Sequence, residues 1–179
     1  EAENLRSQIQ QALHNQHQSQ IKQELKLLDD LLSQHKWVEA YQYAAKMRRL
    51  YPETPLLHGI EQHIADARVQ YRHTLEAKFV EAAEKNNVEV AMDLLKELDR
   101  YLTPDEARMF METADTVITK YRETLGARFK MAVSDRRWTE AIGFGDAITS
   151  QFPNTTMAKE VRELLDTIQS RADEDETAT

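Results

Sequence analysis

The sequence predicts an all-α protein built from a tandem helical repeat of about 50 residues. Only 4 Gly and 4 Pro occur in 179 residues, which is too few for a β-sandwich or barrel rich in tight turns. Apolar residues recur every three or four positions, and no segment shows the alternation typical of a strand. A nine-residue motif also recurs at an offset of 50, a period typical of solenoid repeats.

The repeat is clearest in residues 71–79, which recur as residues 121–129 with six of nine positions identical. Ala91 and Ala141 each follow twelve residues after the Phe that ends a copy, and Ala40 marks a weaker first copy. Pro52, Pro104 and Pro153 then punctuate the chain at intervals of 52 and 49 residues. Matches this coherent indicate three units in tandem, of which two are complete and the third is truncated at its long helix.

Each unit is expected to alternate a long helix with a short one. Thr103 before Pro104 and two acidic residues is a strong start signal, because it combines a cap with Pro at the first helical position. We predict long helices at about 21–35, 54–86, 104–136 and 155–171, and short helices at about 38–51, 88–101 and 138–151. Residues 1–20 form a Gln-rich start of the first long helix, residues 21–171 the repeat domain, and residues 172–179 a disordered acidic tail.

The N-terminal helix carries a thin apolar stripe that includes Leu5, Ile9 and Leu13. An apolar stripe this narrow buries little apolar surface by itself, so a stable helix here requires a neighbour as its packing partner. The neighbour is the repeat array, with residues 1–20 as a capping helix, or a second copy of the chain, giving a homodimer, or a region beyond this chain. Because the chain begins at Glu1 and not at Met, we expect a processed protein or a piece of a longer one.

The turns between long and short helices resemble the second half of a tetratricopeptide repeat. Residues 34–41 and 135–142 each place Trp, two spacers and Ala at the expected helix crossing, with Pro twelve residues after the Ala. The physical reason is that Ala lets two helices approach closely while the aromatic ring plugs the turn. The middle copy departs from this pattern, because Val88 replaces Trp and Pro104 falls thirteen residues after Ala91. The period is also longer than the family's, and the resemblance covers about residues 20–170.

This resemblance implies a right-handed α-solenoid of tetratricopeptide-like hairpins and a non-catalytic scaffold for protein interactions. Such a scaffold presents a groove to a peptide or helix of a partner protein. Five side chains would face that groove: Lys22, His73, Glu76, Glu123 and Lys130. They do not form the Lys/Asn clamp that some of these domains use to bind C-terminal carboxylates, so that ligand class is disfavoured.

The alternative is a structural, oligomerisation or spacer module of a larger, membrane-anchored protein. The endings at residues 51–53 and 152–154 are similar to repeats of bacterial envelope lipoproteins and their periplasmic partners, which favours a cell-envelope location. The cellular compartment otherwise stays open.

Composition and motifs disfavour most other functions. The net charge of -8 and the lack of Cys argue against nucleic-acid binding, thiolate catalysis and Cys-ligated metals. No apolar run is long enough to insert into a membrane. His14 and His17 share a helix face without completing a metal site, and Gly143 and Gly145 fit close helix packing better than phosphate binding. We expect no enzyme, cofactor or metal.

Overall fold

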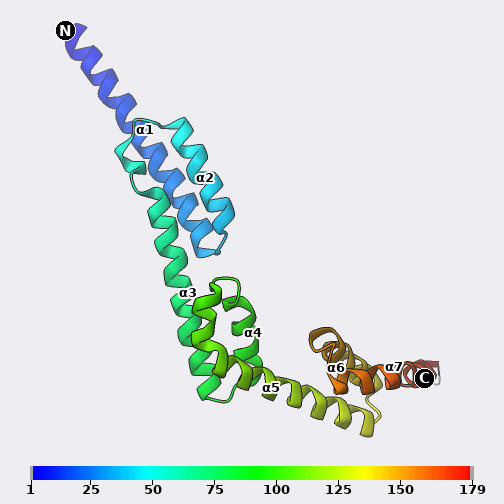
Figure 1. The fold of residues 1–179 in the computed structure, drawn as a ribbon. Coiled ribbons are helices and arrows are strands. Elements are labelled where there is room, and N and C mark those ends of the chain that lie inside the picture. Colours follow the sequence, from blue (N-terminus) through cyan, green and yellow to red (C-terminus); the bar gives the residue numbers. More distant parts are fainter. Residues whose placement is uncertain (1, 178–179) are drawn as a thin grey trace. The chain divides into compact units, whose positions relative to one another are not determined.

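A computed structural model describes residues 2–177 of the chain, and this part contains helices and no strands (Figure 1). The all-α prediction is therefore confirmed. The elements in chain order are α1 (Ala2–Ser33), α2 (Trp37–Leu50), a 3₁₀ turn (Pro55–Leu57), α3 (Ile60–Glu84), α4 (Val88–Leu98), α5 (Pro104–Ser134), α6 (Trp138–Gln151) and α7 (Thr156–Thr177). They form two compact units, the first ending at Thr74 and the second beginning at Leu75, so the boundary falls inside α3.

The helices follow the predicted alternation of long and short, with differences at several of their ends. α3 begins at Ile60, later than predicted, because the Thr54 hydroxyl caps the short 3₁₀ turn and Gly59 breaks the backbone with φ +71°. α4 ends at Leu98, three residues before the predicted end. α5 starts at Pro104 with the capping box expected there, in which Thr103 and Glu106 satisfy each other's backbone N–H groups.

The acidic tail requires a correction, because the structure continues α7 through Thr177 where the composition predicts disorder for residues 172–179. Two side-chain contacts explain the added turns. The Trp138 indole Nε1–H donates to the Asp175 carboxylate at 2.8 Å, and the Gln169 amide donates to Asp173 one turn away at 2.9 Å. Residues 178–179 lie outside the described part of the chain.

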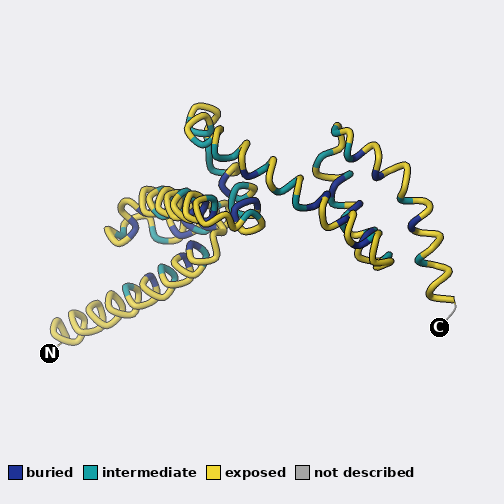
Figure 2. Tube along the Cα trace, turned by 90° about the horizontal axis from the view of Figure 1, so that it is seen from below, coloured by how far each residue is buried: buried dark blue, intermediate teal, exposed yellow. Residues whose placement is uncertain are grey.

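Each unit has its own apolar core. In the first unit, the second half of α1 packs with α2, the 3₁₀ turn and the start of α3; in the second, α5, α6 and α7 share a core. Among the described residues, the first half of α1 packs into neither core, and it is exposed along its length (Figure 2). The buried side chains of the first core are Ile21, Leu28, Leu32, Ala40, Ala44, Met47, Leu57, Ile60 and Ile64. Those of the second are Leu125, Phe129, Ala132, Ala141, Ile148, Ala158, Val161 and Ile168.

The three turns between long and short helices share one backbone conformation. His35, Asn86 and Arg136 have φ of 58°, 55° and 58°, at intervals of 51 and 50 residues. In each turn the N–H of this residue bonds to the carbonyl three residues back, and the next N–H bonds to the carbonyl five back. This is the Schellman motif, which satisfies the last carbonyls of a helix. The backbone therefore repeats with the period seen in the sequence.

The alanines predicted at the helix crossings are all fully buried. Ala40, Ala91 and Ala141 each have 0% exposure, at the same point of α2, α4 and α6. Gly145, one turn after Ala141, lies so close to α7 that a Cβ atom there would meet Leu165 at 2.9 Å and Val161 at 3.1 Å. The close-packing interpretation thus holds for Gly145. It does not hold for Gly143, because a Cβ atom at that position would meet no atom of another described helix within 4 Å.

Candidate functional site

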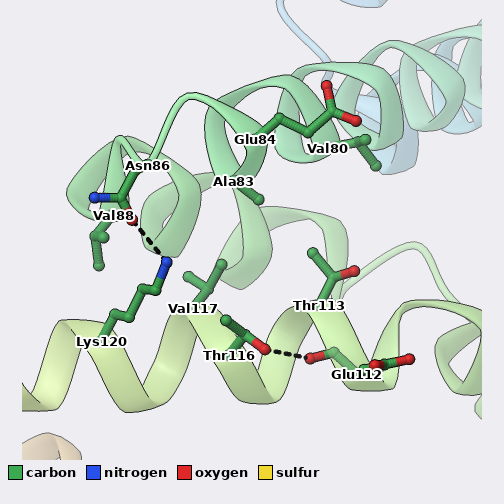
Figure 3. Close-up of a pocket in the computed structure, with 10 residues that line it drawn as sticks. All are labelled: Val80, Ala83, Glu84, Asn86, Val88, Glu112, Thr113, Thr116, Val117 and Lys120. Carbon is green, nitrogen blue, oxygen red and sulfur yellow. Dashed lines mark hydrogen bonds between the residues drawn. The ribbon is translucent and has the colours of Figure 1, made fainter.

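A pocket of about 300 Å³ lies in the second unit, where the end of α3, the start of α4 and the middle of α5 meet (Figure 3). It opens beside the turn that joins α3 to α4, so two successive hairpins contribute its walls. Ten residues line it: Val80, Ala83, Glu84, Asn86, Val88, Glu112, Thr113, Thr116, Val117 and Lys120.

The floor of the pocket is apolar. Val117 is buried with 3% exposure, and Ala83 and Val88 are half-buried. In Figure 3, Ala83 and Val88 point towards α5 while Val117 and Thr113 rise from α5 to meet them. Val80 extends the apolar surface towards the opening, where it is 37% exposed. The arrangement suits an apolar group that enters from solvent.

One hydrogen bond closes one side of the pocket. The Lys120 ammonium donates to the Asn86 side-chain oxygen at 2.8 Å, which joins α5 to the turn after α3. Asn86 holds the left-handed position of that turn, and Asn tolerates this conformation better than most residues. The backbone turn at the end of α3 therefore positions Asn86, the hydrogen-bond partner of Lys120.

Two carboxylates set the charge of the rim. Glu84 on α3 and Glu112 on α5 are exposed, and within residues 2–177 neither side chain has an ion-pair partner. The preceding carboxylate along α3 is different, because the Lys85 ammonium bonds to Glu81 and lowers the pKa of the Glu81 carboxyl by that hydrogen bond and by its charge. The rim thus offers two free negative charges beside one ammonium already engaged by Asn86.

The pocket presents exposed carboxylates, threonine hydroxyls and one ammonium. The carboxylates are exposed and stand on different helices, and no side chain of the pocket is placed as a nucleophile beside a base. Among the described residues, no cluster of three or more His, Asp or Glu side chains is arranged to hold a metal ion. In the same part of the chain, no helix combines the length and apolar character that crossing a membrane requires.

The five side chains predicted to face a groove do not line this pocket. Lys22 lies on α1, His73 and Glu76 on α3, and Glu123 and Lys130 on α5. Glu123 and Lys130 are two turns apart on one helix, and both are exposed, as are Lys22 and His73, whereas Glu76 is half-buried. Lys22 and His73 belong to the first unit and the other three to the second. A groove joining all five stays a prediction.

Sequence reasoning missed most residues of the pocket, although one signal pointed to it. Val88 is the departure from Trp in the middle turn. Trp37 and Trp138, the corresponding residues of the other two turns, are half-buried and pack against the cores, as turn plugs should. A small side chain at a turn position where a large aromatic side chain is expected predicts unfilled space beside it. Val88 is such a residue, and this inference would have located the pocket.

Two other hollows lie elsewhere, one in each unit. One is walled by the Trp138 indole and otherwise mostly by polar and charged residues, with Arg136 and Arg137 among them. The other adjoins α1 in the first unit, where the His17 ring makes an edge contact with Tyr51 at 4.9 Å between centroids and the side chains of His14 and Gln18 hydrogen-bond to each other.

Comparison of the chain with known protein families, with curated proteins and with solved structures finds no match. The tetratricopeptide-like resemblance and the solenoid arrangement accordingly stay predictions, while the helical fold and the recurrent turns are observed directly.

Proposed function

We propose that this protein is a non-catalytic scaffold that binds a segment of a partner protein, and that the pocket between α3, α4 and α5 is its main contact. One observation carries the proposal: an open pocket with an apolar floor and a charged rim, whose walls come from two successive helical hairpins. Interfaces are held mainly by a few side chains inserted into such pockets and surrounded by polar contacts.

Selection from a random peptide library on the immobilised chain tests this function. We expect the selected peptides to lose binding to Val88→Trp, because the new indole occupies the pocket from within. Val90→Trp is the matched control, since Val90 lies on the same helix, is 46% exposed and does not line the pocket. Thr116→Trp blocks the pocket from α5, so the test does not depend on one variant.

Peptides that bind both blocking variants as well as the unmodified chain would contradict the proposal. So would a library that yields no binder. Circular dichroism of each variant verifies that the helices are retained.

The second candidate function is self-association through the first half of α1, and the exposed apolar stripe favours it. Leu5, Ile9 and Leu13 are 60%, 52% and 61% exposed and four residues apart, so they share one face of the helix. Between Ala2 and Gln20 only Glu3 and Arg6 carry a full charge besides the histidines. Two copies of this helix would therefore meet little like-charge repulsion, and a second copy is the occupant that the stripe fits.

Light scattering over a range of concentrations tests this candidate. Self-association predicts a mass above the 20.8 kDa of one chain, falling to that of one chain when Leu5, Ile9 and Leu13 are all replaced by Ser. The replacements leave the two apolar cores untouched, because none of the three residues is part of either. A mass of one chain at every concentration would rule the candidate out.

A further inference from the structure

The middle hairpin turn lacks a side chain that the other two turns possess. Two residues after each left-handed position, the short helix begins with Trp37, Val88 or Trp138. Because the three turns have the same backbone conformation, the three side chains start from equivalent points. Val88 carries no aromatic ring, so an aromatic side chain from outside the chain could pack beside this position.

The other two turns show how this protein accommodates an indole there. In the first unit, Trp37 packs against the core and its ring lies 6.0 Å from that of Tyr71, between centroids. In the third turn, Trp138 packs against the second core and its Nε1–H donates to the Asp175 carboxylate at 2.8 Å. An apolar bed and an acidic hydrogen-bond acceptor thus surround the ring at Trp138.

The pocket beside Val88 also combines an apolar bed with acidic side chains, at helix positions other than those that contact Trp37 and Trp138. Val117, Ala83 and Val88 form the apolar bed, and the acidic residues of the lining are Glu84 on α3 and Glu112 on α5 (Figure 3). Its volume of about 300 Å³ is at the lower end of the range of ligand pockets, so it suits one large side chain better than a whole peptide. The two unpaired carboxylates favour a positive charge next to that side chain.

We propose that the pocket binds the indole ring of a tryptophan on a partner protein, with a Lys or Arg of the partner beside it facing Glu84 and Glu112. The partner's ring would lie beside Val88, the residue that stands where Trp37 and Trp138 stand in the other two turns. This specificity rests on the proposed function, since it identifies the side chain that the scaffold recognises. The net charge of -8 on the whole chain favours the approach of a basic segment in the same way.

Three small probes separate the ring from the charge. Tryptamine carries an indole and an ammonium, indole-3-propionate carries the same ring with a carboxylate, and isopentylamine carries an ammonium on an aliphatic chain. Each is titrated into the isotope-labelled full chain, and the amide signals of Val88, Thr116 and Val117 are followed by NMR. We expect saturable shifts with tryptamine, about two- to tenfold tighter than with isopentylamine and at least about twofold tighter than with indole-3-propionate.

Variants assign the shifts to the pocket and to its rim. Val88→Trp should abolish the tryptamine shifts, while Val90→Trp should keep them. Replacing Glu84 and Glu112 together by Gln should remove the preference for tryptamine over indole-3-propionate. The inference is overturned if tryptamine leaves these amides unshifted, if isopentylamine binds equally well, or if the shifts persist in Val88→Trp.

The outcome for the scaffold function is separate. Library peptides that need the pocket but contain no Trp would overturn this specificity and leave the proposed function standing. Peptides that bind Val88→Trp and Thr116→Trp as tightly as the unmodified chain would overturn the proposed function itself.

Discussion

Replacing Ala141 by Leu should lower the free energy of unfolding by about 1 to 3 kcal/mol. Ala141 has 0% exposure and belongs to the core shared by α5, α6 and α7. The three heavy atoms that Leu adds have no space there, so side chains must leave their preferred rotamers or the helices must separate. Urea denaturation followed by circular dichroism measures the loss.

The neighbouring residue provides the control for this substitution. Glu140 is exposed and its carboxylate pairs with Arg137 on the surface. Glu140→Leu should therefore cost under about 1 kcal/mol, the value of an exposed ion pair. An equal loss in the two variants, or a larger one for Glu140→Leu, would show that the face assigned to α6 is wrong.

Replacing Gly145 by Val should also lower the free energy of unfolding by about 1 to 3 kcal/mol or somewhat more. A Cβ atom at Gly145 would lie 3.1 Å from Val161 and 3.3 Å from Phe129, both buried core side chains, in addition to 2.9 Å from Leu165. Crowding on three sides outweighs the gain in helix propensity on replacing Gly. The same denaturation experiment measures it.

A substitution at Gly143, two residues before Gly145 on the same helix, should have the opposite effect on the free energy of unfolding. A Cβ atom there would meet no atom of another described helix within 4 Å, so Gly143→Ala should raise the free energy of unfolding by about 0.5 to 1 kcal/mol. If Gly143→Ala lowers the free energy of unfolding as much as Gly145→Val does, the close approach of α6 and α7 at Gly145 is not the cause of the loss in Gly145→Val.

Much of the local structure was predictable, because short-range signals determine it. Thr103 and Pro104 specify the start of α5 by capping chemistry alone, and the alternation of long and short helices follows from apolar spacing and proline. The acidic end of α7 was not predictable from composition. Its helix is supported by Asp175, which accepts a hydrogen bond from a tryptophan 37 residues earlier in the chain.

The pocket was less predictable than the helices for a similar reason. Its floor combines Ala83, Val88 and Val117 from three helices, and sequence spacing does not show which side chains of different helices meet. The left-handed residues of the three turns were missed as well, because Asn86 is accompanied by His35 and Arg136 instead of the glycines that usually mark this conformation.

The dissociation constant of one library-selected peptide for Val88→Trp, compared with that for Val90→Trp, tests the central claim most directly. If the pocket beside Val88 holds the main anchor of the partner, filling it should weaken binding by at least about 30-fold, the effect of losing a dominant interface side chain. The Val90→Trp chain should bind like the unmodified protein. Equal dissociation constants for the two tryptophan variants would contradict the claim that this pocket is the main contact.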